Sequence, residues 1–335
     1  MKYVAVTQPG GPEVLALRER EQPKIAADEV LIRVAAAGVN RPDVQQRRGL
    51  YPPPLGACDT LGLDVAGVVE TAGASVKWPV RGERVCALVN GGGYAEFCAV
   101  PAVQCMPLPD GFGFVQAAAL PEALFTAWNN VIRLGRLAAG ETLLVQGGTS
   151  GVGMAAIQLA CLLRSACVLA TVGTEQKARV ARDIGASAAV LYTRADWPQQ
   201  IRALTGGRGV DVILDAQAGP YTQKELDLLA PDGRLVLIAS HLGAAAEVDV
   251  RDLVRRRLTL TGSTLRPRSP EYKGGIAREL VAEVWSLLSR GAFKVNICAT
   301  FPIEEVASAH ALLDANQQVG KVVLIVAAEL CDSQP

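Results

Sequence analysis

The stretch LLVQGGTSGVGMAAIQLA, which runs from Leu143 to Ala160, decides the fold of this chain. Its apolar start, LLV, predicts a buried strand, and the residues after the turn place apolar side chains at three- and four-residue spacing, which predicts a helix over 152–164. Four glycines lie in the turn between them: Gly147, Gly148, Gly151 and Gly153. Strand, glycine turn and helix in this order are typical of a turn that binds a dinucleotide diphosphate.

The spacing of these glycines is a variant of G-x-G-x-x-G, so a turn that merely lets strand and helix pack together is the alternative. The downstream sequence favours the binding turn. Further apolar strand patterns follow at 167–172, 188–192, 210–216, 234–239 and 258–262, and helical patterns such as 174–185 separate most of them. Six apolar strands alternating with helices predict an α/β fold, a doubly wound parallel sheet of the Rossmann type, which binds ligands at its switch point.

The flanking segments differ in pattern from this region. Residues 1–122 are rich in short strand-like runs separated by Gly and Pro, which predicts a β-rich domain, a partly closed barrel. Residues 266–335 begin with a polar stretch, RPRSPEYKGG, and continue with two helical patterns and the strand KVVLIV. This tail is too short for a core of its own, so we expect it to pack on the N-terminal domain. The predicted domains are therefore 1–122 with 266–335, and 123–265.

Composition excludes several function classes. The 335 residues carry 33 Lys and Arg against 33 Asp and Glu, which argues against a nucleic-acid or anionic-membrane surface. The absence of a signal-peptide pattern and of an apolar run of about 18 residues predicts a soluble, cytosolic protein. The eight cysteines show no C-x-x-C pair, and His241 and His310 lie far apart. We expect reduced, structural cysteines and no metal site.

The end of the second predicted strand bears on the choice of nucleotide. A protein that binds NAD needs a carboxylate there for the adenine ribose. This strand instead ends with Gly173 and Thr174, and Lys177 follows, while Tyr192 ends the third strand. Hydroxyls and an ammonium group suit a 2′-phosphate, which predicts NADPH over NADH. Glu175 does not fit a 2′-phosphate, because its carboxylate would repel one; we expect it to face solvent and to interact favourably with the helix dipole. For Lys177 the alternative interpretation is an ordinary lysine in solvent.

Several segments together resemble one family, the quinone oxidoreductase branch of the medium-chain dehydrogenase/reductase superfamily. They are GGPEVL (10–15), AAGVNRPDVQQRRGLYPPP (36–54), LGLDVAGVVETAG (61–73), RGERVCAL (81–88), PEALFTAWNNV (121–131), GTSGVGMAAIQLA (148–160) and GKVVL (320–324). The resemblance covers essentially the whole chain, and segment 40–54 is most similar to the p53-inducible quinone oxidoreductase group. It implies that the β-rich part is a GroES-like catalytic domain and that the protein is a homodimer.

The sequence departs from the zinc-dependent relatives at their ligand positions. Asn40 stands where those enzymes carry a cysteine ligand, and their G-H-E motif reads Gly62-Leu63-Asp64. The four-cysteine zinc lobe is missing, because the glycine run 91–93 continues directly to Tyr94. Without a Lewis acid, the protein lacks the usual way to activate an alcohol for oxidation, whereas a quinone or an activated enone is already electrophilic.

The resemblance also implies a set of site residues. It places Asn40 beside the nicotinamide, Tyr51 in the acceptor pocket and Thr126 near the nicotinamide ribose. The resemblance assigns the diphosphate to the turn with Gly148, Ser150, Gly151, Val152 and Gly153. It assigns the 2′-phosphate to Gly173, Thr174, Lys177 and Tyr192. The nicotinamide half is assigned to Ser240, Ser263, Leu265 and Asn316.

The expected reaction is hydride transfer from NADPH to a quinone that lies over the nicotinamide. Tyr51 offers a ring for stacking and a hydroxyl that donates to a quinone oxygen; the alternative is a loop tyrosine packed on the prolines at 52–54. Asn40 either orients the carboxamide or the substrate oxygen, or is a turn residue. We interpret Asp43 as a helix-start residue rather than a base.

Two other functions stay open. One is reduction of the C=C bond of an enone or enal, with Tyr51 as the proton donor. The other is a catalytically weak NADPH-binding structural or sensor protein, which would bind the cofactor tightly without turnover. The segment LTLTGSTL (258–265) is expected to be an edge strand that pairs with its copy across a two-fold axis, which agrees with a homodimer.

Overall fold

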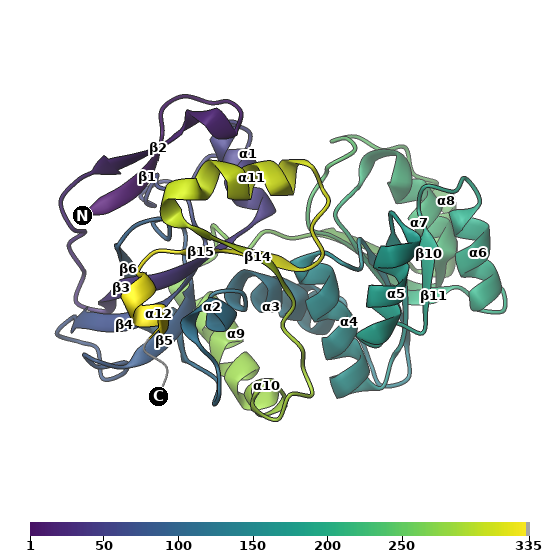
Figure 1. The fold of residues 1–335 in the computed structure, drawn as a ribbon. Helices are drawn as coiled ribbons and strands as arrows, with labels where there is room; N and C mark the ends of the chain where they lie inside the picture. Colours follow the sequence, from purple (N-terminus) through teal and green to yellow (C-terminus); the bar gives the residue numbers. More distant parts are fainter. Residues whose placement is uncertain (333–335) are drawn as a thin grey trace. The chain divides into compact units, whose positions relative to one another are not determined.

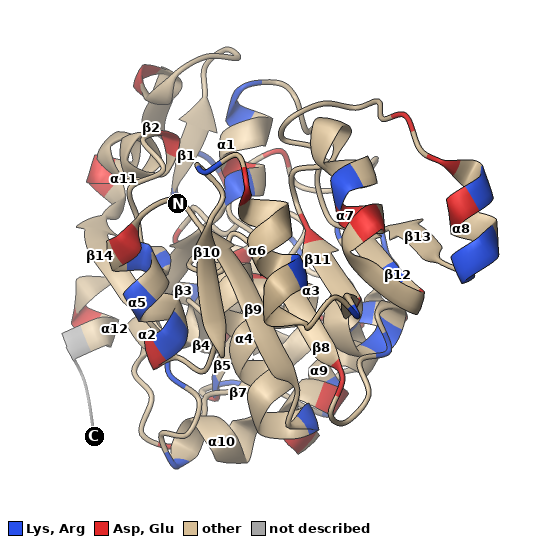
Figure 2. Ribbon diagram, turned by 90° about the vertical axis from the view of Figure 1, so that its right-hand side faces the viewer, with Lys and Arg blue, Asp and Glu red and all other residues tan. Residues whose placement is uncertain are grey.

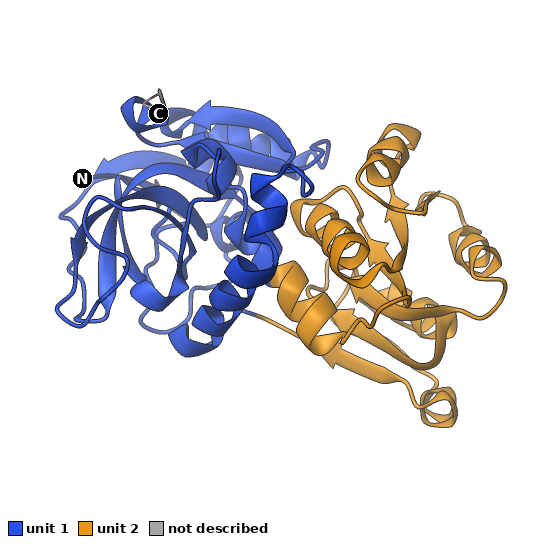
Figure 3. Cartoon of the chain, turned by 90° about the horizontal axis from the view of Figure 1, so that it is seen from below, with its two compact units in different colours: residues 1–125, 265–335 blue, residues 126–264 orange. Residues whose placement is uncertain are grey.

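The computed structural model describes residues 1–332, and residues 333–335 at the end of the predicted tail lie outside the described part. The chain forms two compact units, shown in different colours in Figure 3. Unit 1 contains Met1–Phe125 and Leu265–Pro335, and unit 2 contains Thr126–Thr264. The first boundary falls inside helix α3 (Pro121–Ala127), three residues beyond the position expected from the sequence, because a continuous helix gives no change in pattern at that point.

Unit 2 is built around a six-stranded sheet with the order β10-β9-β8-β11-β12-β13 (Figure 1). Every pairing in it is parallel. Its strands are β8 (Thr142–Gln146), β9 (Cys167–Val172), β10 (Ala188–Leu191), β11 (Val210–Asp215), β12 (Leu229–Leu237) and β13 (Thr259–Gly262). The order reverses direction between β8 and β11, which is the doubly wound arrangement that the sequence predicted.

The helices of unit 2 connect these strands, so the sheet is covered and its strands are apolar. They are η3 (Trp128–Leu134), α4 (Gly151–Arg164), α5 (Glu175–Asp183), α6 (Trp197–Leu204), η4 (Gly219–Tyr221), α7 (Thr222–Leu228) and α8 (Val250–Arg256). Three of them begin at a side-chain cap, and in α8 the cap is Asp249, which accepts from the Asp252 N–H. The Ser150 hydroxyl accepts from the Gly153 N–H, and the Thr174 hydroxyl accepts from the Lys177 N–H, which fixes the first turns of α4 and α5.

Unit 1 contains a seven-stranded sheet and a separate two-stranded ribbon of β1 and β2. The larger sheet has the order β14-β15-β3-β4-β5-β7, and β6 pairs with β3. Among the described residues this path has two ends, β14 and β7, so the pairing is an open sheet rather than a closed barrel. The strands are β1 (Lys2–Val6), β2 (Leu15–Glu19), β3 (Glu29–Val39), β4 (Asp64–Ala72), β5 (Arg84–Leu88), β6 (Phe97–Pro101), β7 (Cys105–Pro107), β14 (Ile297–Pro302) and β15 (Lys321–Ile325).

The tail packs on the N-terminal part of unit 1, because β15 pairs antiparallel with β3. Its polar opening is not a loop, however. Helix α9 (Pro270–Glu283) already begins inside RPRSPEYKGG, with Ser269 as its cap and a proline in its first turn. The first of the two helical patterns of the tail is divided at Val284, after which α10 (Trp285–Ser289) follows.

The remaining elements of unit 1 are short helices that border the sheet. They are η1 (Pro12–Val14), α1 (Arg41–Arg47), η2 (Ala102–Gln104), α2 (Phe114–Ala117), η5 (Ile303–Glu305), α11 (Val306–Asp314) and α12 (Ala328–Asp332).

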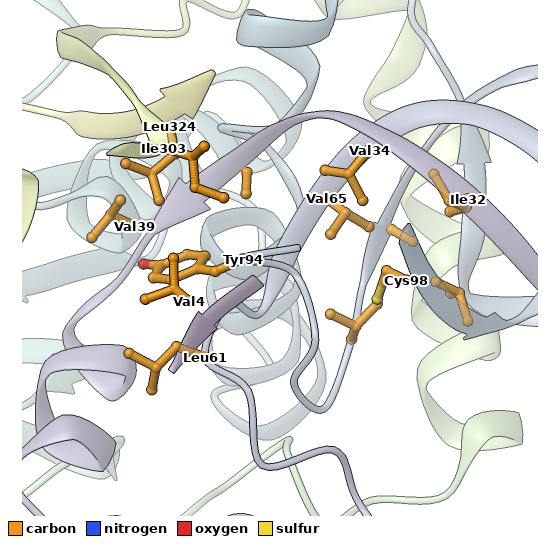
Figure 4. Close-up of a cluster of buried hydrophobic side chains, with 14 of the residues drawn as sticks. Val4, Ile32, Val34, Val39, Leu61, Val65, Tyr94, Cys98, Ile303 and Leu324 are labelled. Atoms are coloured by element: carbon orange, nitrogen blue, oxygen red, sulfur yellow. The ribbon is translucent and has the colours of Figure 1, made fainter. Parts of the chain in front are cut away.

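The core of unit 1 joins residues that are far apart in the sequence (Figure 4). Val4, Leu61, Val65 and Leu324 are fully buried together. Tyr94 lies among them, and its hydroxyl donates to Asp43 at 3.1 Å, so the one polar atom of this side chain has a partner inside the core. This core fixes the start of helix α1, which carries Asp43.

Charge and cysteine chemistry agree with the composition. Figure 2 shows Lys and Arg interspersed with Asp and Glu on helices such as α5 and α8. All eight cysteines are free. Cys167 is exposed rather than inside the apolar pattern, because it is the first residue of β9 and lies at the end of the sheet. Among the described residues, none of the helices has both the length and the apolar character needed to cross a bilayer.

Candidate active site

The glycine turn between β8 and α4 packs too tightly for side chains. A Cβ atom on Gly153 would lie 2.3 Å from the Gly147 carbonyl oxygen, and one on Gly148 would lie 2.7 Å from the Cβ of Ala170. Gly147 itself has φ +74°, which favours glycine. The turn therefore offers bare backbone where a ligand can approach closely.

Ser150 holds this turn in place. Its hydroxyl accepts from the Gly153 N–H at 3.0 Å and donates to the Gly147 carbonyl at 2.9 Å. Gly151 and Val152 follow as the first residues of α4, whose 14 residues give the N-terminus a positive end. The first N–H groups of a helix have no intrahelical partner, so this turn can hold a diphosphate without any charged side chain.

The end of β9 forms a second group with the end of β10. The Tyr192 hydroxyl lies only 2.7 Å from the position that a Cβ atom on Gly173 would occupy, so the tyrosine crosses directly over this glycine. Thr174 caps α5 by accepting from the Lys177 N–H at 3.2 Å. The structure thus brings Gly173, Thr174, Lys177 and Tyr192 to one corner of the sheet.

Arg194 is a residue of this corner that the sequence reasoning missed. Its guanidinium lies 3.8 Å from the carboxylate of Glu175, and both side chains are exposed. The arginine therefore offsets the charge of Glu175, the residue that fitted a 2′-phosphate least. Its position two residues after Tyr192, at the end of the third strand, was the available signal.

The other predicted residues of unit 2 follow the same edge of the sheet. Ser240 and Ser263 come after β12 and β13, which are paired at their ends through Leu237 and Gly262. The Ser263 N–H donates to the Leu237 carbonyl at 3.0 Å, and its hydroxyl accepts from Asn129 at 3.3 Å. Parallel strands place their carboxyl ends together, so these serines share an edge with the glycine turn.

Thr126 lies in α3, and its carbonyl oxygen accepts from the Asn130 side chain at 2.7 Å. Leu265 and Asn316 belong to unit 1, where Leu265 is buried. Asn316 is exposed with φ +53°, a conformation that asparagine tolerates better than most residues.

Asn40 lies in a buried polar cluster of unit 1. Its side-chain nitrogen donates to Asp64 at 2.8 Å, and its side-chain oxygen accepts from the Lys321 ammonium group. Lys321 also donates to Asp64 at 2.7 Å. Lys321 was missed as a member of this cluster, although the GKVVL motif that contains it was noted.

These residues do not fit a catalytic zinc ion. Zinc takes cysteine, histidine or carboxylate ligands, whereas Asn40 and Leu63 stand at the resembling positions and the ammonium of Lys321 would repel a cation. Within residues 1–332 there is also no group of three or more His, Cys, Asp or Glu side chains that could hold a metal ion.

Asp43 lies in the first turn of helix α1, where its side chain completes a capping box with Asn40, in agreement with its interpretation as a helix-start residue. Its carboxylate accepts from the Asn40 N–H at 2.8 Å and from the Gly62 N–H at 3.1 Å, in addition to the Tyr94 hydroxyl. Burial raises the pKa of Asp43 to about 6, against the opposing effect of these hydrogen bonds. The carboxylate thereby joins the backbone at Asn40 to the backbone at Gly62.

Tyr51 lies half-buried in the loop after α1, and the side chains of Leu50 and Leu55 in the same loop are exposed. The guanidinium carbon of Arg266 lies 5.4 Å from the centre of its ring, which is cation–π geometry. Arg266 was not among the predicted residues. Unit 1 therefore joins an aromatic ring to a cation at the predicted acceptor loop.

Comparison with known proteins matches both units. The alcohol dehydrogenase GroES-like domain matches residues 26–110, and the zinc-binding dehydrogenase model matches residues 151–282. A quinone oxidoreductase of Rattus norvegicus is 32% identical over 329 residues, which cover 97% of this chain and 98% of the relative.

Solved structures give the same assignment of fold. The Escherichia coli quinone oxidoreductase in complex with NADPH has a TM-score of 0.86 at 29% identity, over 97% of this chain and all of the other. An NAD-dependent alcohol dehydrogenase has a TM-score of 0.84 at 31% identity, over 98% of this chain and all of the other.

Proposed function

The chain belongs to the quinone oxidoreductase branch of the medium-chain dehydrogenase/reductase superfamily, and on this basis we propose that it is an NADPH-dependent quinone reductase that works without zinc. The observation that carries the proposal is the glycine turn capped by Ser150, because it combines bare backbone with the positive end of a 14-residue helix. Resemblance to enzymes alone would fix the fold but not the chemistry of the site.

The residues of unit 2 fit NADPH. The turn from Gly148 to Gly153 would hold the diphosphate, and the corner of Gly173, Lys177 and Tyr192 would hold the 2′-phosphate. Arg194 strengthens this corner by offsetting Glu175, and no carboxylate ends β9 to grip a free ribose hydroxyl. Bound NADPH supplies the hydride; the protein's own residues position it and the acceptor.

The residues of unit 1 suit an acceptor that needs no Lewis acid. Tyr51 provides a ring on which a flat acceptor can stack and a hydroxyl that can donate to one of its oxygens. Asn40, fixed by Lys321 and Asp64, would orient the groups beside it rather than exchange protons. A quinone is electrophilic enough to accept hydride under these conditions, whereas an alcohol would require activation by a metal ion.

We also propose a homodimer through strand β13. It is the last strand of the unit 2 sheet and pairs only with β12 among the described residues. Leu260 on this edge and Val254 on α8 are exposed apolar side chains, and an edge of this kind pairs with a second copy. Light scattering of the wild type and of Leu260→Asp is expected to give a dimer and a monomer, respectively; a monomeric wild type would contradict the proposal.

The function is tested by binding first and turnover second. Fluorescence titration is expected to give a lower Kd for NADPH than for NADH. The protein is then assayed with 9,10-phenanthrenequinone and with an enone, each with and without a metal chelator. We expect quinone turnover that the chelator leaves unchanged. Turnover of the enone alone would assign C=C reduction, tight binding without turnover would assign a sensor, and loss of activity with the chelator would contradict the zinc-free reaction.

A further inference from the structure

Arg266 is a buried cation whose guanidinium is only partly satisfied by the protein. The residue is 5% exposed. Its Nε and Nη2 groups donate to the Asn90 carbonyl at 2.9 and 2.7 Å, and Nη2 also donates to Gln46 at 2.7 Å. The third nitrogen, Nη1, is buried and has no hydrogen-bond acceptor within the described residues 1–332.

A second buried cation lies beside it. Lys273 is fully buried and donates to the Asn90 side chain at 2.6 Å and to the Arg266 carbonyl at 3.4 Å. Burial lowers the pKa of Lys273 to about 8. Carboxylates act on both cations, because Glu122 raises the pKa of each and Asp43 also raises that of Arg266, against the larger effect of burial. In the described part of the chain, the buried Nη1 group of Arg266 still has no hydrogen-bond partner, and a buried donor without an acceptor is costly, so this place favours an electron-rich oxygen.

The geometry gives the free nitrogen a fixed direction. Because Asn90 and Gln46 hold the other two nitrogens, the planar guanidinium cannot turn, and Nη1 is set in place before any ligand arrives. The ring of Tyr51 lies over the same group, at 5.4 Å from its carbon atom. A preorganised donor beside an aromatic ring is suited to a flat ligand that carries an oxygen at its edge.

We propose that Arg266 binds an oxygen of the acceptor through Nη1 and stabilises the negative charge that this oxygen gains on reduction. The inference rests on the proposed quinone reductase function. Hydride delivers two electrons and one proton to the quinone, which leaves a hydroquinone monoanion; a proton from water then completes the hydroquinone. The guanidinium stays protonated throughout and transfers nothing, so its contribution is electrostatic.

The test compares Arg266→Ala and Arg266→Lys with a matched control, Arg268→Ala. Arg268 is exposed and also lies over a tyrosine ring, that of Tyr272, at 4.9 Å. For Arg266→Ala we expect kcat/KM for 9,10-phenanthrenequinone to fall about 10- to 100-fold, which is the usual range for a lost charged hydrogen bond. The Kd for NADPH is expected to change less than twofold, and the control to match the wild type.

Two further readouts separate binding from structural support. Free guanidinium chloride, at a concentration that leaves the fold intact, is expected to restore part of the activity of Arg266→Ala, whereas the same concentration of NaCl is not. The Kd of Arg266→Ala for the quinone, measured by tryptophan quenching without NADPH, is expected to be higher than that of the wild type. Arg266→Lys keeps the charge and a donor for Asn90, so it should fold even if the alanine variant does not, with about tenfold lower kcat/KM.

The outcomes are distinct. If both Arg266 variants bind and reduce the quinone as the wild type does, the inference is wrong. If their activity is lost only in parallel with thermal stability and guanidinium restores none of it, Arg266 is a structural clip, and the inference is also wrong. If the wild type reduces no quinone, the proposed function is wrong. In that case the Kd for the quinone tests the inference by itself, and an unchanged Kd in Arg266→Lys would show that Arg266 does not bind the quinone.

Discussion

The ammonium nitrogen of Lys321 lies 2.7 Å from the Oδ2 atom of Asp64, and both side chains are buried. Asn40 completes the contact by donating to the same carboxylate and accepting from the same ammonium group. One protein cation therefore neutralises the carboxylate at positions that resemble the zinc ligands of related enzymes. Strands β15 and β4 and the start of α1 are joined by this charge pair.

Removal of the lysine alone should be costly. Lys321→Met leaves the Asp64 carboxylate buried without its counter-charge, so we expect the free energy of unfolding to fall by about 3–5 kcal/mol, as is usual for a broken buried pair. Urea unfolding measures this. The double variant Asp64→Asn, Lys321→Met should recover part of the loss, because the uncompensated charge is then gone.

The control for this prediction is an exposed ion pair in the same unit. Arg33 and Glu329 form a salt bridge in which 42% and 63% of the two side chains are exposed. Arg33→Ala should therefore lower the free energy of unfolding by less than about 1 kcal/mol. An equal loss in the two single variants would mean that burial of the Lys321–Asp64 pair has no special cost.

The glycine turn should tolerate no methyl group at Gly153. In Gly153→Ala the new Cβ would lie 2.3 Å from the Gly147 carbonyl oxygen, so the turn must shift away from the backbone that would hold the diphosphate. We expect the Kd for NADPH to rise on the order of tenfold or more in a fluorescence titration. Gly262→Ala is the control, because its Cβ would meet only one atom, at 3.9 Å; wild-type affinity in both variants would contradict the assigned role of the turn.

Nucleotide selectivity should depend on the cations near Tyr192. Lys177→Ala and Arg194→Ala are each expected to raise the Kd for NADPH about 3- to 30-fold, with little change for NADH, since only NADPH carries the 2′-phosphate. Glu175→Gln should have the opposite sign and lower the Kd for NADPH. Arg179→Ala, an exposed arginine on the same helix α5, is the control. A parallel loss of NADH affinity would contradict a 2′-phosphate site here.

Much of the fold was predictable because its signals are local. The glycine turn, the apolar strands and the helix that starts at Gly151 are adjacent in sequence, so their order alone indicates the parallel sheet. Strand β14 was missed because its residues alternate between half-buried and exposed and none is fully buried. Helix α9 was missed in its first turns because Gly274 and Gly275 disfavour a helix interior. A Cβ on Gly274 would lie 3.0 Å from Val103, so little room is left there for a side chain.

The unpredicted site residues depend on contacts between distant segments. Lys321 is 281 positions from Asn40, and Arg266 is 176 positions from Asn90. Each looks like an ordinary surface cation in its own segment, and only the folded unit 1 buries it. Arg194 differs in that it lies near predicted residues, yet its ion pair with Glu175 depends on how β10 aligns with the start of α5.

The hydroxyl of Tyr51 should matter to the acceptor more than to the nucleotide. Tyr51→Phe keeps the ring for stacking and removes only the donor, so we expect kcat/KM for the quinone to fall several-fold to tenfold. The Kd for NADPH is expected to stay within twofold of the wild type. Equal losses in both quantities would refute the assigned role, and Tyr272→Phe, at a half-buried tyrosine of the same unit, controls for loss of a hydroxyl.

His310 gives the fold a predictable response to acid. It is fully buried, its Nδ1 lies 3.2 Å from a guanidinium nitrogen of Arg47, and Tyr94 packs edge-on against it. Burial, followed by the charge of Arg47, lowers the pKa of His310 to about 3, against the opposing effect of Asp314. The neutral ring accepts from Arg47 through Nδ1, which a protonated ring could not do.

Because the unfolded chain takes up this proton near pH 6.5 and the folded protein only near pH 3, the folded state loses stability as the pH falls between these values. The slope from this one group is at most about 1.4 kcal/mol per pH unit, and it vanishes above pH 7.

His310→Gln removes the titration, so its free energy of unfolding, measured in urea at intervals from pH 7 to 4.5, should fall less steeply than that of the wild type. Asp43, whose raised pKa acts in the opposite direction, is present in both proteins and cancels in the comparison. Identical slopes in the two proteins would mean that His310 titrates normally in the folded state.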